Sequence, residues 1–399
     1  MAREAETWDV FCRVVDNYGD VGVAWRLARQ LAVDHGKRVR LWLDDLTVLA
    51  KLRPEIAPAY DIQSLEGVEV ARMPRDPQVP FDEVADVVVE TFGCDPPERY
   101  VLAMAGRTPR PRWINLEYLS AEDWVEGSHA LPSPNPRLPL VKHYFFPGFT
   151  PRTGGLLRER GLLERRDAFR VDAGAQAQFW RRLVGRAPPR DALTVSLFAY
   201  AGAPFDSLRL SLAAYPGPVW LVVPEGAAAT ALAGREPAHP TIRRNRRDGG
   251  SRREVEVIGI PFLPQDRYDE LLWACDVNFV RGEDSFVRAQ WAARPFVWHI
   301  YPQDDGAHWV KLAAFLRRYT EDLDRAHAGA VTGLWEAWNR REGTPAEGAP
   351  AGVGLGEAWA AFIARRETLA AHAAAWCERL ARRRDLAAEL VDFADNVLK

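Results

Sequence analysis

The sequence is poor in cysteine and has no long apolar run. Only four cysteines occur among 399 residues, namely Cys12, Cys94, Cys275 and Cys377. Their wide spacing argues against disulfides and a zinc site, so we expect reduced, buried thiols and a cytoplasmic protein. No window approaches the roughly 18 apolar residues of a membrane span, and the first residues lack the apolar core of a signal peptide. The sequence therefore predicts no membrane association.

Two glycine-rich signatures of nucleotide-binding enzymes are also missing. Neither G-x-G-x-x-G nor G-x-x-x-x-G-K-[ST] occurs in the chain. Because these motifs cradle the phosphates of their ligands, their absence disfavours a dinucleotide-dependent oxidoreductase and a P-loop enzyme.

An excess of charge of either sign is lacking as well. The chain has 52 basic and 55 acidic residues and a formal net charge of -3, so no overall field favours nucleic acid or membrane surfaces. Basic residues are concentrated once, in Arg243–Arg247 with Arg252 and Arg253. We interpret this run as a solvated loop, with contact to an acidic protein acceptor as the alternative.

What the chain does contain is a series of short apolar runs separated by helical or polar segments. At 399 residues it exceeds what one hydrophobic core usually supports, and the alternation predicts two α/β domains with parallel sheets. The predicted strands are residues 8–15, 38–44, 84–91 and 113–118, followed by 193–200, 219–224, 255–262, 276–281 and 295–301.

Shifts in composition predict the domain boundaries. Residues 1–155 are expected to form an N-terminal domain and residues 191–356 a C-terminal domain. A linker region is predicted over 156–190, where the apolar pattern gives way to a charged, glycine-broken stretch. Residues 342–356, rich in Gly, Ala and Pro, predict a second linker. Residues 357–399 predict one or two long helices that pack back on the N-terminal domain.

The most informative segment is a predicted strand, turn and helix over residues 9–31. Such a turn normally offers backbone N–H groups and the positive end of the helix dipole to an anion. Here Asp16 and Asp20 would repel a phosphate. The turn is therefore predicted to meet a cation or to accept a proton. Helix capping is the alternative, although two acidic residues exceed what one cap requires.

A second predicted strand, turn and helix, Phe279–Arg288, is a better anion site. Gly282 lets the backbone approach a ligand closely, Arg281 adds a positive charge, and Asp284 or Ser285 can cap the helix. An ordinary capping sequence without a ligand is the alternative.

Polar and aromatic residues follow two other strands of the same predicted domain. Phe198 and Tyr200 end its first strand, where a ring can lie against a base, and Gln303 follows its last strand as a candidate ligand of sugar hydroxyls. Open α/β sheets bind ligands at the carboxyl ends of their strands, so these residues are expected at one edge. His299 and His308 are interpreted as packing or capping residues.

Three segments resemble a known family. Phe11–Asp20, Ile114–Glu122 and Phe279–Trp291 are similar, in this order, to segments of the protein-arginine rhamnosyltransferases that modify bacterial elongation factor P. The resemblance extends from about residue 8 to the C-terminus and is weaker over 155–190 and 226–254. It implies GT-B architecture, in which two Rossmann-like domains face each other across a cleft and a C-terminal helix returns to the N-terminal domain.

The resemblance also implies an activity. The expected reaction is an inverting transfer of L-rhamnose from dTDP-β-L-rhamnose to a guanidinium nitrogen of elongation factor P, giving an α-linked product. Asp20 is expected to act as base, Asp16 to orient the acceptor, and Glu283 to lie near the donor. No other cofactor is expected, and no metal, because helix N–H groups and Arg281 can stabilise a leaving diphosphate.

The remaining expected site residues fall into two sets. The donor-binding set is Phe198, Tyr200, Phe262, Gln265, Arg281, Gly282, Asp284, Ser285 and Gln303. The acceptor-side set is Asn17, Tyr18, Gly19 and Glu117. The residues alone leave open a GT-B enzyme acting on a small-molecule or lipid acceptor, and a non-catalytic nucleotide-sugar-binding regulator. They also leave open thymidine or uridine, the identity of the sugar, and which arginine accepts it.

Overall fold

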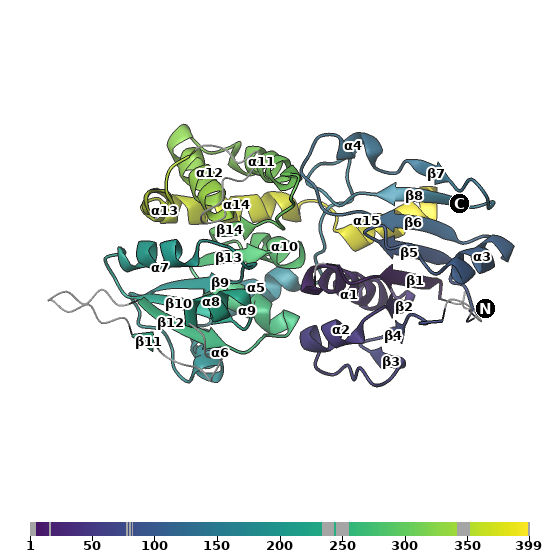
Figure 1. Ribbon diagram of the computed structural model, residues 1–399, viewed down its shortest axis with the longest axis horizontal. Helices are drawn as coiled ribbons and strands as arrows, with labels where there is room; N and C mark the ends of the chain where they lie inside the picture. Colours follow the sequence, from purple (N-terminus) through teal and green to yellow (C-terminus); the bar gives the residue numbers. More distant parts are fainter. Residues whose placement is uncertain are drawn as a thin grey trace. The chain divides into compact units, whose positions relative to one another are not determined.

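The computed structural model describes residues 5–15, 17–76, 79, 81, 83–233, 243–244, 255–340 and 352–397. The chain divides into two compact units, which we describe separately (Figure 1). Unit 1 consists of Met1–Arg160 and Leu380–Lys399, and unit 2 consists of Gly161–Arg379. Within the described ranges, no helix combines the length and the apolarity that crossing a bilayer would require.

Unit 1 is built on an eight-stranded sheet with the order β3-β4-β2-β1-β5-β6-β8-β7. Strand β1 pairs in parallel with both β2 and β5, so the strand order reverses direction at β1. Ligands of open α/β sheets bind at the carboxyl ends of the strands beside such a reversal. The strands are β1 (Thr7–Cys12), β2 (Arg38–Leu43), β3 (Ile62–Leu65), β4 (Val68–Arg72), β5 (Val87–Thr91), β6 (Arg112–Leu116), β7 (Pro132–Pro134) and β8 (Val141–Phe145).

Helices and an aromatic core support this sheet. Tyr100 and Met104 of α3 pack with Phe11, Trp42 and Trp113 from three strands. The chain's C-terminal segment returns to the unit through α15 and a π-helix, η1. The helices are α1 (Asn17–Val33), α2 (Leu46–Leu52), α3 (Glu98–Gly106), α4 (Val125–Ser128), α15 (Leu386–Asp392) and η1 (Phe393–Val397).

Unit 2 is likewise built on a single sheet, which has six strands in the order β11-β12-β10-β9-β13-β14. Strand β9 pairs in parallel with β10 and β13, so the reversal in this sheet lies at β9. Every residue of β9 and β10 is buried, as the continuous apolar runs predict. The strands are β9 (Leu193–Leu197), β10 (Val219–Pro224), β11 (Arg243–Arg244), β12 (Val255–Ile260), β13 (Val277–Arg281) and β14 (Phe296–His299).

The helices of unit 2 include two that lie where a linker was predicted. They are α5 (Leu162–Val171), α6 (Ala173–Val184), α7 (Phe205–Ala213), α8 (Ala227–Ala233), α9 (Gln265–Ala274), α10 (Asp284–Trp291), α11 (Ala307–Thr320), α12 (Arg325–Asn339), α13 (Leu355–Ile363) and α14 (Arg366–Ala381). Figure 1 shows α12 and α13 close together, and they pack against each other.

Two predicted boundaries differ from those of the structure. Residues 161–190 belong to unit 2, because Phe179 and Trp180 of α6 are buried against Trp220 of β10. The return to unit 1 begins at Leu380 and not at residue 357, so α13 and most of α14 remain with unit 2. Most of the predicted linker 342–356 lies outside the described residues.

Candidate active site

The turn between β1 and α1 is held by carboxylates. Asp20, in the first turn of α1, is only 3% exposed and accepts the Val15 backbone N–H at 3.0 Å. Asp44, which follows β2, accepts the Val14 N–H at 3.0 Å. Two N–H groups that could have bound a phosphate therefore already bind carboxylates. Asp16 lies outside the described residues.

The other predicted acceptor-side residues lie at the same edge of the sheet. Asn17, Tyr18 and Gly19 form the start of α1; the side chain of Asn17 lies outside the described part of the chain. Lys51 lies over the Tyr18 ring, with Nζ 5.9 Å from its centre. Glu117 directly follows β6, and its Oε1 accepts from Asn115 Nδ2 at 2.7 Å.

Two thiols lie beside the turn. Burial raises the pKa of Cys12 well above its ordinary value and that of Cys94 to about 12. Cys94 donates its S–H to the Phe11 carbonyl, with the sulfur 3.2 Å from the oxygen. Thiols that stay protonated are poor nucleophiles, so neither is suited to covalent catalysis. The four cysteines are free, and all but the half-buried Cys94 are buried, as the sequence predicted.

In unit 2, Arg281 ends β13 and lies over two aromatic rings that follow β9. Its guanidinium carbon is 4.4 Å from the centre of the Phe198 ring and 4.6 Å from that of Tyr200. The Phe198 N–H donates to the Phe279 carbonyl at 2.9 Å, which ties the end of β9 to β13. These contacts bring a positive charge and flat apolar surfaces together at the strand reversal of this sheet.

The start of α10 differs from the predicted cap. The cap residue is Glu283, whose own side chain forms no capping hydrogen bond. Ser285 Oγ instead accepts the Arg281 N–H at 3.1 Å and donates to the Arg281 carbonyl, while Asp284 accepts from Gln265 Nε2 at 3.0 Å. The prediction that Asp284 or Ser285 caps α10 is therefore wrong. Both side chains stabilise the turn that precedes the helix.

Gly282 has a backbone conformation that favours glycine. Its φ is +60°, in the left-handed region that glycine adopts without steric cost. Its carbonyl accepts Trp298 Nε1 at 2.9 Å, and the Trp298 ring is stacked on Phe286 of α10 with 4.0 Å between ring centres. The turn is thus fixed by β14 and by the helix that it opens.

Sequence reasoning missed one aromatic residue of this cluster. The Phe198 ring has edge contacts with Phe262 at 6.4 Å and with Tyr268 at 5.8 Å between ring centres. The Tyr268 hydroxyl is buried, and burial raises its pKa. A signal was available, because Tyr268 lies one helical turn after the predicted residue Gln265.

Within the described part of the chain, Gln303 forms no hydrogen bond with another predicted donor residue. Its N–H donates to His308 Nδ1 at 3.1 Å. His299 Nδ1 likewise accepts the Tyr200 N–H at 3.2 Å. Both ring nitrogens act as hydrogen-bond acceptors of the backbone, which agrees with the packing or capping role predicted for these histidines.

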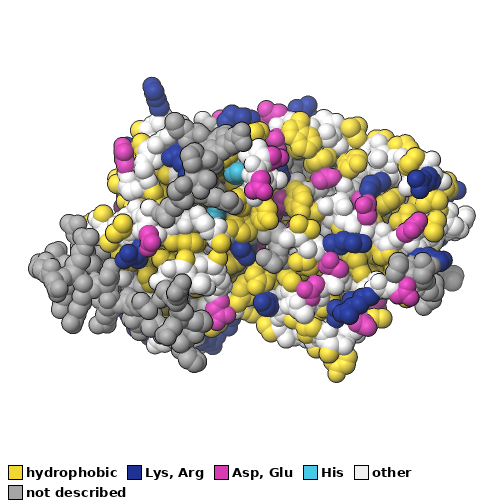
Figure 2. All heavy atoms as spheres, viewed as in Figure 1, with side chains coloured by type: hydrophobic (Ala, Val, Ile, Leu, Met, Phe, Trp, Pro, Cys, Tyr) yellow, Lys and Arg dark blue, Asp and Glu magenta, His cyan; other side chains and the backbone are white. Residues whose placement is uncertain are grey.

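Charges are interspersed on the face of the molecule in Figure 2, in keeping with the net charge of -3. The basic run over residues 243–253 lies outside the described residues, apart from the backbone of β11. Its interpretation as a solvated loop or as an acceptor contact stays a prediction.

Within the described ranges, no group of three or more His, Cys, Asp or Glu side chains could hold a metal ion.

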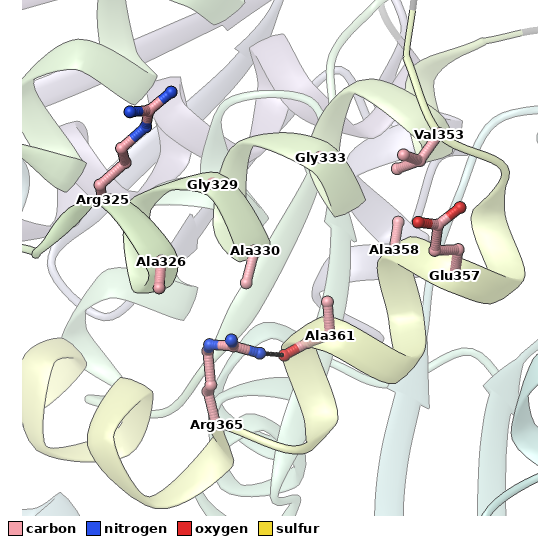
Figure 3. Close-up of a pocket in the computed structure, with 10 residues that line it drawn as sticks. All are labelled: Arg325, Ala326, Gly329, Ala330, Gly333, Val353, Glu357, Ala358, Ala361 and Arg365. Carbon is pink, nitrogen blue, oxygen red and sulfur yellow. Dashed lines mark hydrogen bonds between the residues drawn. The ribbon is translucent and has the colours of Figure 1, made fainter.

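A groove of about 520 Å³ lies between α12 and α13 of unit 2 (Figure 3). Small residues line its α12 side, and Arg365 borders it with its guanidinium bonded to the Ala361 carbonyl at 2.8 Å. None of the predicted site residues lines this groove. We attribute it to the missing side-chain bulk at Gly329 and Gly333 and not to the chemistry of the strand edges.

Comparison with known proteins identifies relatives over almost the whole chain. The sequence profile described as "Elongation-Factor P (EF-P) rhamnosyltransferase EarP" matches residues 8–395. The protein-arginine rhamnosyltransferase of Pseudomonas putida is 49% identical over 338 residues, which cover 84% of this chain and 86% of that protein. The protein of the same name from Pseudomonas aeruginosa is 46% identical over 88% of this chain and 89% of its own length.

Solved structures agree with the sequence relatives. A structure from work on EarP-mediated arginine glycosylation of translation elongation factor EF-P has a TM-score of 0.66 and 35% identity, covering 98% of this chain and 99% of that one. A glycosyltransferase from Rickettsia africae, only 9% identical, has a TM-score of 0.53 over the full length of both chains, which is a likeness of fold alone.

Proposed function

Because the chain belongs to the EarP family of elongation factor P rhamnosyltransferases and has the α/β GT-B fold, we propose that it transfers L-rhamnose from dTDP-β-L-rhamnose with inversion. The chain is a protein-arginine rhamnosyltransferase, and its acceptor is an arginine guanidinium of elongation factor P. The thymidine diphosphate donor and the α-linked product are the finer parts of the proposal. We also propose that it acts in the cytoplasm, because its acceptor is a translation factor.

The observation that carries the proposal is the opposite chemistry of the two strand–turn–helix segments. In unit 1, the turn N–H groups of Val14 and Val15 bind carboxylates, which disfavours a phosphate there. In unit 2, α10 begins at Asp284, three residues after Arg281, so the positive end of the helix dipole and the guanidinium charge together favour an anion. We therefore assign the donor diphosphate to unit 2 and the cationic acceptor to unit 1.

The donor half-site suits a nucleotide diphosphate. Phe198, Tyr200 and Phe262 offer ring surfaces for a base, and Gln265 is a candidate for polar contact with the nucleoside. Arg281 and the N–H groups at the start of α10 would stabilise the negative charge that develops on the leaving diphosphate. These groups supply the stabilisation that a metal ion gives in other transferases, so we propose a metal-free reaction.

The acceptor half-site has to solve a problem of proton transfer. A guanidinium has a pKa of about 12.5 to 13.8 and an aspartate about 3.9, so deprotonation before attack opposes a gap of roughly nine units, or about 12 kcal/mol. We therefore propose that Asp20 accepts the proton as the C–N bond forms, while Asp16 orients the guanidinium by charge-assisted hydrogen bonds. Glu283, the cap residue of α10, would act near the donor sugar.

One experiment tests the function as a whole. Elongation factor P is incubated with the enzyme and dTDP-β-L-rhamnose, and its intact mass is measured. We expect the increment of a single deoxyhexose, which should be absent when the acceptor arginine is replaced by lysine. Magnetic resonance of the product should give an α anomer, and UDP-sugars should not replace the donor. An unmodified acceptor mass would reject the proposal, and a β-linked product would reject inversion.

A further inference from the structure

Two aromatic rings are stacked at the carboxyl edge of the sheet in unit 1. Phe92 directly follows β5, and Tyr118 lies two residues after β6. Their ring centres are 4.4 Å apart and their planes are inclined by 15°. Both side chains are half-buried, so part of this aromatic surface is accessible.

The backbone at Phe92 is held in an unusual conformation. Its φ is +59°, in the left-handed region, which costs a bulky side chain on the order of 1–3 kcal/mol. The Phe92 N–H donates to the Leu116 carbonyl at 2.7 Å, which fixes the turn against the end of β6. The fold thus orients this ring against a local steric preference, a feature that is concentrated at ligand sites.

A single buried amide joins the two turns that carry the rings. Asn115 is 2% exposed, and its Oδ1 accepts the Gly93 N–H at 3.1 Å while its Nδ2 donates to Glu117 Oε1 at 2.7 Å. Only this orientation of the amide satisfies both contacts. Asn115 therefore sets the position of the turn after β5 relative to the Glu117 carboxylate.

The same turn is bonded to the end of β1, from which the chain continues to Asp20. The Thr91 hydroxyl and the Cys94 thiol both donate to the Phe11 carbonyl, with donor–acceptor distances of 2.9 and 3.2 Å. Strands β1, β5 and β6 are consecutive neighbours in the sheet. The stacked rings, Glu117 and Asp20 consequently lie at one edge, beside the strand reversal.

We propose that the stacked pair of Phe92 and Tyr118 is the surface on which the acceptor guanidinium lies, with Glu117 accepting from its N–H edge and Asn115 positioning both. This inference rests on the proposed function. A guanidinium is flat, delocalised and weakly hydrated on its faces, so it can stack on an aromatic ring while its edge binds carboxylates. A lysine ammonium lacks this planar face and its fork of donors. The pair would therefore contribute to the choice of arginine over lysine.

The test is steady-state kinetics with the full-length enzyme at saturating dTDP-β-L-rhamnose and varied elongation factor P. We expect Phe92→Leu and Tyr118→Leu to raise the acceptor KM roughly three- to thirty-fold, as expected for a lost cation–aromatic contact. The conservative variants Phe92→Tyr and Tyr118→Phe keep the ring and should stay within about twofold of wild type. The donor Kd from calorimetry should not change in any of them.

Tyr60→Leu is the matched control, because Tyr60 is a 66% exposed aromatic residue of the same unit. It should leave the acceptor KM unchanged. A wild-type acceptor KM in both leucine variants would overturn the inference, and so would an equal loss of donor affinity. If one leucine variant does not fold, the other and the two conservative variants still decide. Failure of the wild-type enzyme to modify elongation factor P would instead reject the proposed function itself.

Discussion

The Asp20 carboxylate accepts the Val15 backbone N–H at 3.0 Å, which fixes one of its oxygens at the turn before α1. Asp20→Asn keeps an oxygen for this hydrogen bond but cannot take a proton from the acceptor. We expect kcat to fall by roughly 10²- to 10⁴-fold, as is usual for a lost general base. The Kd for dTDP-β-L-rhamnose, measured by calorimetry, should stay within about twofold of wild type, because the donor is assigned to unit 2.

The matched control is Asp61→Asn, because Asp61 is an exposed aspartate of the same unit that pairs with Arg72. It should keep full activity. Loss of donor binding in Asp20→Asn, or retention of wild-type kcat, would show that Asp20 is not the acceptor-side base.

Arg281 is predicted to bind the donor diphosphate. Arg281→Gln removes the charge above Phe198 and Tyr200, and we expect the Kd for thymidine diphosphate to rise roughly 10- to 100-fold, as for the loss of a charge-assisted contact. Arg209→Gln is the control, because Arg209 lies on α7 of the same unit with a partly exposed side chain. Equal thymidine diphosphate affinity in wild type and Arg281→Gln would contradict the assignment.

The sequence predicted the central strands of both sheets, because buried parallel strands are nearly continuous apolar runs, but it missed β3, β4, β7, β8 and β11. Residues 219–224 were predicted with the bounds that the structure has for β10. The C-terminal ends of the strands were predicted less accurately. Residues 13–15 were predicted as part of the first strand, but β1 ends at Cys12. At Val14 and Val15 the backbone N–H groups bind Asp44 and Asp20 in place of a neighbouring strand. The contact between Val14 and Asp44 spans 30 residues and leaves no periodic signal in the sequence.

Helices α5 and α6 were missed for another reason. Their buried apolar residues, Leu162, Phe179 and Trp180, are scattered among arginine, glutamate and alanine, so the apolar face is narrow. In the candidate site as well, some residues could not be predicted from the sequence. The motifs around Asp20 and Arg281 could be read from residue types, whereas the bridge formed by Asn115 and the ring of Tyr268 depend on tertiary contacts.

A buried ion pair supports the donor half-site. Arg288 of α10 binds Asp269 of α9 through two hydrogen bonds of 2.9 and 2.6 Å, and both side chains are almost fully buried. Asp269→Ala leaves a buried guanidinium without this partner, and we expect a loss of about 3–5 kcal/mol of unfolding free energy in urea. The double variant Asp269→Leu with Arg288→Met removes both charges and should lose much less. Equal stability of wild type and Asp269→Ala would contradict this role.

Acidification is expected to weaken unit 1 through His129. Burial lowers the pKa of His129 from its ordinary value of 6.5, and its Nδ1 accepts the Phe146 N–H at 3.1 Å, which requires an unprotonated nitrogen. Because the folded state favours the neutral ring, this stabilisation is complete above the unfolded pKa and is lost as pH falls through the folded pKa. We expect the midpoint temperature of thermal unfolding to decrease as the pH is lowered from about 7.5 to about 5.5. The decrease should be smaller in His129→Gln, whose amide oxygen accepts the same N–H without titrating. His35→Gln, two residues after the end of α1, is the control and should keep the wild-type slope. Equal slopes for His129→Gln and wild type would exclude His129 as a source of the pH dependence.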